Sequence, residues 1–210
     1  MLRRFLLGIM VVSLASMAWA GVPDLNVSTA SIPDGAAGSS VFVLPNAAGI
    51  GFDEAFAPGG VEVDATITLT LIDTQGDPIF LFPFEDLWLE SSNGSLSYCA
   101  GGTAADQSTD ANGETTWSNP VAGGVNNDLF TGTETVVVMV AGSPLSSIGP
   151  AILFNSADQN GDLFVNLSDI TRFTVILNGG YDIAGDFNND GIVNLSDIVR
   201  MTAGIGVVCN

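Results

Sequence analysis

The chain of 210 residues contains no histidine and no lysine, and its four basic residues, all arginines, stand against 23 acidic residues. Without histidine, acid–base catalysis by histidine and cysteine–histidine nucleophiles are excluded. The formal net charge of −19 also argues against nucleic acids and anionic membrane surfaces as partners, because both bind to basic protein surfaces. We therefore expect neither class of partner.

Paired carboxylates are the catalytic arrangement that remains open. The pairs Asp53/Glu54 and Glu85/Asp86 could in principle form the two-carboxylate site of a glycosidase. No catalytic family motif accompanies them, and exposed acidic turns are the better interpretation. We expect the chain not to be an enzyme.

Long apolar runs are absent except at the N-terminus. Arg3 and Arg4 precede an apolar run from Phe5 to about Ala15, and Ala18-Trp19-Ala20 follows as a cleavage signal. The run is shorter than the ~20 residues that span a bilayer, so we expect a signal peptide over residues 1–20 and no membrane insertion. The predicted location is extracellular or at the cell surface, after cleavage near Ala20.

Cysteine is scarce as well, with only Cys99 and Cys209. In an exported chain oxidation is the default, and a bond between them would close a loop of about a hundred residues, contributing ~4 to 5 kcal/mol. The sequence leaves open the alternative that they lie too far apart and are free or form intermolecular bonds.

Two twelve-residue segments near the C-terminus carry a repeated pattern of oxygen-bearing side chains. DQNGDLFVNLSD spans Asp158–Asp169, and DFNNDGIVNLSD spans Asp186–Asp197. A calcium loop of the EF-hand type takes ligands from positions 1, 3 and 5, a carbonyl at 7, position 9 often through water, and a carboxylate at 12. In the first segment these are Asp158, Asn160, Asp162, Phe164, Asn166 and Asp169, and in the second they are Asp186, Asn188, Asp190, Ile192, Asn194 and Asp197.

The alternative interpretation is that such Asp/Asn/Gly clusters are only turns. Two matches in register favour calcium, and the sequence predicts two bound calcium ions. Each segment is followed by apolar residues at helical spacing, Ile170, Phe173 and Leu177 in the first copy and Ile198, Met201 and Ile205 in the second. Ser168 and Ser196 are the predicted N-caps of these helices. Gly149 and Pro150 argue against a helix that enters the first loop.

This loop–helix pair, from about Ser156 to Cys209, resembles the dockerin type I domain, the calcium-dependent module that docks onto cohesin domains in cellulosomes and related assemblies. The resemblance implies that the matching positions are calcium ligands. Position 6 departs from the pattern, because it is Gly191 in the second loop but Leu163 in the first. A sharp turn there favours glycine, so we expect the first site to be weaker or distorted.

Partner choice in the resembled family is attributed to loop positions 10 and 11 and to the exposed face of the following helix. The corresponding residues are identical in the two copies: Leu167, Ser168 and Arg172 in the first and Leu195, Ser196 and Arg200 in the second. Either repeat could then present the same surface to a partner. The alternative is that the two leucines pack between the halves of the domain and the arginines neutralise nearby carboxylates.

The residues between the leader and the loops have a β pattern. In the run Val63–Leu71 polar and apolar residues alternate, which places Ile67, Leu69 and Leu71 in a core. Further strands are predicted at 40–44, 87–91, 95–99, 115–117 and 135–140, with turns between them, as in an all-β sandwich. Trp88 and Trp117 are expected to be core residues rather than platforms for sugar stacking.

The order of these strands and turns, over about Val61 to Val140, resembles bacterial Ig-like domains of the invasin/intimin type (Big-1). The resemblance rests on the turn Asp73–Pro78 and on the later Thr109–Gly113 segment. The predicted fold class is therefore mostly β with a small α domain. We expect an Ig-like β-sandwich over residues 21–150, a linker over 151–155 and a dockerin-like domain over 156–210.

The expected function is that of a secreted, non-catalytic calcium-binding protein that docks onto a cohesin-like partner in a cellulosome-like or cell-surface assembly. An association with polysaccharide breakdown is implied by the resemblance alone. The alternative is a structural or adhesion subunit that builds a fibre or coat, in which the calcium domain binds neighbouring copies.

Overall fold

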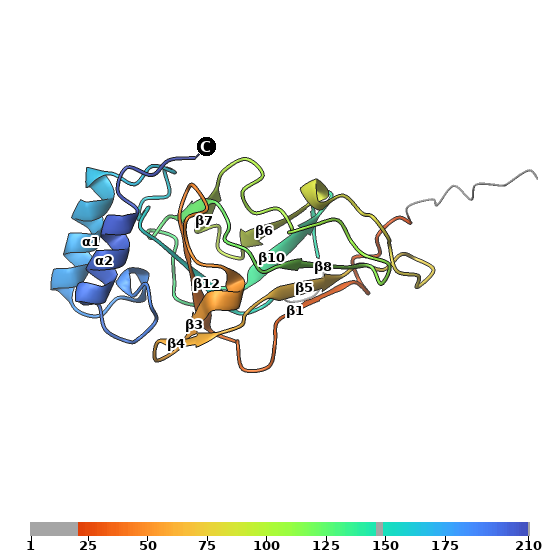
Figure 1. Cartoon of the computed structure of the whole chain (residues 1–210), viewed down its shortest axis with the longest axis horizontal. Coiled ribbons are helices and arrows are strands. Elements are labelled where there is room, and N and C mark those ends of the chain that lie inside the picture. Colours follow the sequence, from red (N-terminus) through yellow and green to blue (C-terminus); the bar gives the residue numbers. More distant parts are fainter. Residues whose placement is uncertain (1–20, 146–148, 210) are drawn as a thin grey trace, which may run out of the picture.

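The computed structural model describes residues 21–145 and 149–209 (Figure 1). The predicted signal peptide lies outside the described residues. The described chain is mostly β, and its two α-helices lie side by side at one end of the long axis. None of the described helices is both long and apolar enough to cross a membrane.

Two antiparallel three-stranded sheets and one antiparallel pair of strands make up much of the β structure. The first sheet has the order β1–β5–β8, with β1 at Thr29–Ser31, β5 at Ile67–Thr70 and β8 at Glu114–Trp117. The second has the order β11–β10–β6, with β11 at Ser143–Pro144, β10 at Val136–Val140 and β6 at Leu87–Ser91. The pair consists of β7 at Leu96–Tyr98 and β9 at Gly123–Val125.

A four-stranded sheet connects this structure to the helices. Its order is β12–β2–β3–β4, with β12 at Ile152–Ser156, β2 at Ser39–Val43, β3 at Ala55–Ala57 and β4 at Val61–Val63. The helices are α1 at Leu167–Gly179 and α2 at Leu195–Ala203. Short 3-10 turns lie at Phe52–Glu54, Phe84–Asp86 and Ile183–Gly185.

The alternation predicted for the central strand is confirmed. Ile67, Leu69 and Leu71 are fully buried in the main hydrophobic core, whereas the threonines between them are partly exposed. The two tryptophans differ from each other. Trp117 is fully buried in this core, as predicted, but Trp88 is partly exposed and lines a shallow pocket beside Tyr98.

The prediction of a linker over residues 151–155 is wrong, because most of that segment is strand β12. β12 pairs in parallel with β2, and all five residues of each strand are buried. A strand covered on both faces has a continuous apolar sequence, and the run Ile152-Leu153-Phe154 fits this pattern. We call residues 21–156 the β region and residues 157–209 the loop–helix region.

The paired strands β2 and β12 lie at the interface between the two regions. Val41 and Phe154 face the main core, whereas Phe42 faces a second hydrophobic cluster formed with the helices. In this second cluster the ring centroid of Phe187 lies 5.1 Å from that of Phe42 and 5.4 Å from that of Phe173. The loop–helix region therefore packs directly onto the β region (Figure 1).

Candidate metal centre

Each twelve-residue segment ends in the first turn of a helix, as predicted. The predicted N-caps, Ser168 and Ser196, are wrong. The caps are Asn166 and Asn194, whose side chains accept hydrogen bonds from the backbone N–H groups of these two serines. Because α1 begins at Leu167 and α2 at Leu195, the carboxylates at loop position 12 fall at the third helical position, where they complete a capping box.

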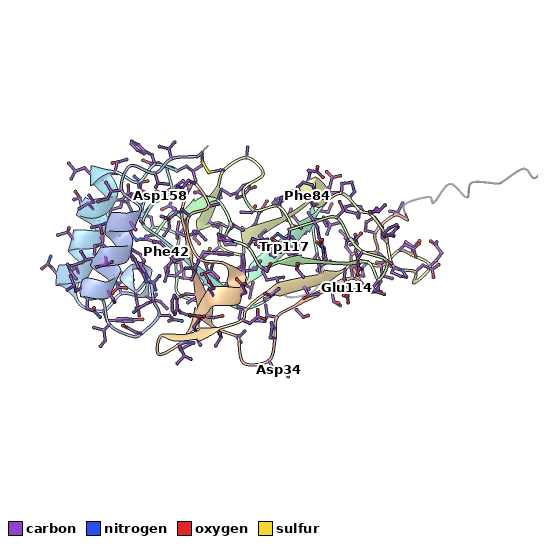
Figure 2. The ribbon with its side chains drawn as sticks, viewed as in Figure 1. Asp34, Phe42, Phe84, Glu114, Trp117 and Asp158 are labelled. Carbon is purple, nitrogen blue, oxygen red and sulfur yellow. A yellow bond between two sulfur atoms is a disulfide. The ribbon has the colours of Figure 1, made fainter. Side chains whose placement is uncertain are left out.

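In the first loop Asp158 organises the turn. Its Oδ1 accepts hydrogen bonds from the N–H groups of Gly161, at 2.9 Å, and Asp162, at 3.2 Å. Its Oδ2 accepts one from the N–H of Leu163 at 2.8 Å. Figure 2 shows Asp158 at the boundary between the β region and the helices. The chain therefore wraps around this carboxylate.

Asp169 closes the first loop from the opposite side. Its Oδ1 accepts from the N–H groups of Gln159, at 2.9 Å, and Asn160, at 3.2 Å, and its Oδ2 accepts from the N–H of Asn166 at 2.9 Å. Both Asp158 and Asp169 are fully buried. Oxygens of Asp158, Asp162 and Asp169 all lie within 4.8 Å of one another, a separation that lets one cation contact all three.

The second loop repeats this pattern. Asp186 accepts hydrogen bonds from the N–H groups of Asp190, at 3.0 Å, and Gly191, at 2.8 Å. Asp197 accepts from the N–H groups of Phe187, at 2.8 Å, and Asn194, at 2.9 Å. Asp186 and Asp197 are also fully buried. The repeat seen in the sequence is thus a repeat of backbone geometry.

Position 3 of the second loop provides a test of whether a cation fits. The Oδ1 atom of Asn188 is buried and has no hydrogen-bond partner among the described residues, while its Nδ2 donates to Oδ2 of Asp190 at 2.9 Å. An unpartnered buried carbonyl oxygen is costly. It is also the atom that a calcium loop uses at position 3, so the residues present fit a hard cation.

The charges point the same way. Beyond residue 20 the sequence has only two basic side chains, Arg172 and Arg200, and both are engaged elsewhere. Arg172 forms a two-armed ion pair with Asp128, at 3.0 and 3.1 Å, and the Arg200 guanidinium lies 4.7 Å from the ring centroid of Phe56. Among the described residues, neither arginine forms an ion pair with the buried carboxylates of the loops.

The burial of these carboxylates is reflected in their pKa values. Burial raises the pKa of Asp158 to about 6, and the charges of Asp169 and Asp162 add to the shift. Burial also raises the pKa of Asp169 and of Asp197. A bound cation would favour the charged form of each carboxylate and reverse this shift.

Position 6 has the predicted conformation in both loops. The φ angle is +65° at Leu163 and +86° at Gly191. Leucine thus adopts a left-handed conformation that costs about 1 kcal/mol or more. The carboxylates of the first loop nevertheless converge, and a weaker affinity of that loop stays a prediction.

The predicted ligands at positions 7 and 9 lie at the edge of each loop. The carbonyl of Phe164 accepts a hydrogen bond from Nδ2 of Asn166 at 3.0 Å, and that of Ile192 accepts one from Nδ2 of Asn194 at 3.3 Å. The Oδ1 atoms of both asparagines cap the helices. Position 9 would therefore contribute through water rather than directly.

The predicted partner-binding residues divide into two groups. Leu167 and Leu195 have exposed fractions of 74% and 70%, so they do not pack between the halves of the region. Ser168 is exposed and Ser196 partly exposed. Arg172 follows the alternative interpretation, since it pairs with the carboxylate of Asp128, whereas Arg200 does not, since it lies over the ring of Phe56. Val175 and Val199 are also exposed on these helices.

Several supporting residues were not identified from the sequence. Asn155, on β12, donates to the carbonyl of Asp186 at 2.7 Å, and Tyr181 donates to its Oδ2 at 3.1 Å. Asn189 donates to the carbonyl of Phe56 at 2.9 Å and has a φ angle of +54°. In the sequence, only Asn155 could have been noticed, as a polar residue that directly follows the apolar run Ile152–Phe154.

Two further expectations concern residues outside the loops. Cys99 and Cys209 form a disulfide with a Cα–Cα distance of 5.7 Å (Figure 2). The acidic pairs Asp53/Glu54 and Glu85/Asp86 lie in separate 3-10 turns, and all four side chains are exposed. The structure places neither pair in a buried cleft.

Comparison with known proteins identifies no family. No family model matches the chain, and no curated protein matches it. A crystal structure of the Lin-41 filamin domain is similar over 62% of this chain and 95% of that chain, with 16% sequence identity and a TM-score of 0.28. A TM-score of this size is too low to establish a shared fold.

Proposed function

We propose that the protein is a secreted, non-catalytic calcium-binding protein, in which an Ig-like sandwich carries a dockerin-like region with two calcium sites. The observation that carries the proposal is the doubled loop, with four fully buried carboxylates in one hydrogen-bond pattern and, in the part of the chain that the structure describes, no ion pair to a basic side chain. Burying such charges is costly unless each is paired or coordinates a metal. Calcium, a hard cation that prefers oxygen ligands, fits this donor set.

The ligands in the first site would be Asp158, Asn160, Asp162, the carbonyl of Phe164, and Asp169. In the second site they would be Asp186, Asn188, Asp190, the carbonyl of Ile192, and Asp197. Calcium supplies positive charge that the chain lacks. The protein's own contribution is the backbone turn around Asp158 and Asp186, and in the first loop this turn holds three carboxylates within reach of one cation.

The proposed docking surface is the outer face of α1 and α2. Leu167, Val175, Leu195 and Val199 are each more than 60% exposed, whereas the opposite faces of the helices pack on Phe42 and Phe187. Large apolar side chains gathered on one exposed face mark an interaction site. Because the position-12 carboxylates lie in the first turn of these helices, bound calcium would hold the helices in place, and we infer that a cohesin-like domain binds their outer face.

The test measures binding of the mature chain to a panel of immobilised type I cohesin domains, in calcium and in chelator. We expect calcium-dependent binding that is lost in the double variant L167D/L195D. The matched control is V22D, because Val22 is equally exposed but lies in the β region. Sedimentation velocity in the same buffers tests the alternative, a subunit that assembles with its own copies.

Calcium-dependent polymers without cohesin binding would favour the structural subunit. Neither binding nor self-association, in a chain that does take up calcium, would contradict the docking proposal. Turnover of a glycan by the purified chain would contradict the non-catalytic assignment.

A further inference from the structure

The C-terminal segment closes over the first loop. The N–H of Val165 donates to the carbonyl of Val207, and the N–H of Gly206 donates to the carbonyl of Val165, both at 2.9 Å. Phe164 and Val208 form an antiparallel bridge beside these bonds. Phe164 is position 7 of the loop, so the pairing fixes the backbone at the carbonyl that would be a ligand.

Strand β9 supports the same loop at position 1. The N–H of Val125 donates to the carbonyl of Asp158 at 3.0 Å, and Asn126 forms an antiparallel bridge with Asn160. A Cβ atom on Gly124 would lie 1.8 Å from Oδ2 of Asp158, so only glycine allows this approach. β9 pairs with β7, and Cys99 directly follows β7.

The disulfide links these two segments, because Cys99 directly follows β7, the partner of β9, and Cys209 directly follows Val208 in the C-terminal segment. We propose that the Cys99–Cys209 disulfide is a positioning element of the first metal site, holding together the segments that fix Asp158 and Phe164. Its loss then weakens cation binding in the first loop and leaves the second loop unchanged. This inference rests on the proposed calcium binding.

The second loop has a separate attachment and serves as an internal control. The carbonyl of Asn189 accepts hydrogen bonds from the N–H groups of Gly59, at 2.8 Å, and Gly60, at 2.9 Å. Its Nδ2 donates to the carbonyl of Phe56, and Asn155 holds the carbonyl of Asp186. These contacts go to β3, to the turn between β3 and β4, and to β12, and involve neither cysteine nor its neighbours.

A general stabilising effect of the bond can be separated from this local one. Closing a chain loop acts mainly on the unfolded state and changes the free energy of unfolding. It does not change the affinity of the folded chain for a cation. A difference between the two loops in the folded chain therefore reports positioning.

The experiment uses the mature chain with one loop disabled at a time. D190A leaves only the first loop and D162A leaves only the second, and each is made with and without C99A/C209A. Calcium is titrated calorimetrically, and circular dichroism checks that each chain is folded. We expect the cysteine substitutions to weaken binding about tenfold or more in D190A, as for a lost supporting contact, and less than about twofold in D162A.

Equal weakening in both backgrounds, or no weakening in D190A, would overturn the inference while calcium binding stands. If neither D190A nor D162A with its disulfide intact binds calcium, the proposed function fails and this inference fails with it. If the cysteine-free chains do not fold, the disulfide of the folded D190A and D162A chains is reduced instead. Dithiothreitol then supplies two electrons and two protons, which yields two cysteine thiols and the cyclic disulfide of the reagent, and the same comparison is made.

Discussion

At the scale of single residues, the two loops differ most at position 6. Leu163 has the left-handed backbone that Gly191 has in the second loop, and a leucine there is strained. The side chain of Leu163 is partly exposed, so it contributes little packing that would offset the strain. The first loop therefore folds in a conformation that its own sequence disfavours.

Replacing Leu163 by glycine should relieve this strain. We expect L163G to raise the free energy of unfolding in calcium by about 0.5 to 1 kcal/mol, since the relief exceeds the entropy cost of glycine. Denaturant titration measures the change. The matched control is G191A, which should lower stability by about 1 kcal/mol although its Cβ would meet open space. A destabilised L163G would show that Leu163 contributes packing.

The raised pKa of Asp158 gives a pH prediction whose sign depends on calcium. In the metal-free chain this carboxyl has a pKa of about 6, above the usual 3.8, so its contribution to stability is present at low pH and is lost as the pH rises through about 6. Asp169 and Asp197, whose pKa values are also raised, act in the same direction. With calcium bound, protons compete with the ion and acid removes it.

The stabilisation caused by calcium should therefore shrink as the pH falls from about 7.5 to about 5.5. Thermal unfolding in metal-free buffer and in calcium, at several pH values, measures this difference. A calcium effect that stays constant or grows towards acid pH would contradict the assignment of these buried carboxylates as ligands.

At the scale of elements, the helix starts can be tested directly. Asn166 and Asn194 cap α1 and α2, whereas Ser168 is exposed and its N–H is bonded to the cap. N166A and N194A should each lower the free energy of unfolding by about 1 kcal/mol, and S168A should change it by less than about 0.5 kcal/mol. Denaturant titrations of the three variants check this. A larger loss of stability in S168A than in N166A would indicate that Ser168 is the N-cap.

The arginine contacts attach the helices to the β region but should contribute little energy. The ion pair between Arg172 and Asp128 is largely exposed, and such pairs are worth about 0 to 1 kcal/mol. The contact of Arg200 with Phe56 is of similar strength. We expect R172A and R200A to change stability by less than about 1 kcal/mol each and to leave calcium binding unchanged. A loss of calcium affinity in either variant would show that these contacts support the loops.

The sequence predicted many of the strands and both helices but not strand β12, which joins the β region to the loop–helix region. Strict alternation of polar and apolar residues located β5, whereas β6 and β10 were predicted as short strands between turns; in all three strands one face is buried and the other is partly exposed. Sequence reasoning did not find β12 as a strand, because its partner β2 lies more than a hundred residues away. The loops were predicted correctly in their spacing and helices, since short-range backbone hydrogen bonds determine both.

The N-caps and the contacts of the arginines could be assigned only from the three-dimensional structure. A cap depends on which residue has extended backbone geometry before the helix, and two neighbouring polar residues in Asn166-Leu167-Ser168 offered a choice. Arg172 and Arg200 look equivalent in the sequence, but their different surroundings in the β region give them different partners. The disulfide likewise depended on a distance that the sequence does not contain.

At the scale of the whole molecule, β2 and β12 make the two regions one packed structure. Both strands contribute to the main core, and Phe42 on β2 also contributes to the helix cluster. Unfolding the loop–helix region would expose Phe42 on β2 and Leu44 directly after it. Metal binding in the loops should therefore stabilise the β region as well.

We expect one cooperative unfolding transition, with the same midpoint for helix circular dichroism and for tryptophan fluorescence. Trp88 and Trp117 are the only tryptophans after residue 20 and both lie in the β region, so fluorescence reports that region. Chelation should lower both midpoints together. Two separate transitions, with only the helical one sensitive to chelator, would mean that the regions fold independently.

The most direct test of the central claim is a calorimetric titration of calcium into the metal-free mature chain, residues 21–210. The account predicts two binding sites, with one lost in D162A and the other in D190A. No binding heat and no change in thermal stability on adding calcium would show that the paired loops are turns held by their own hydrogen bonds, and the proposed function would be contradicted.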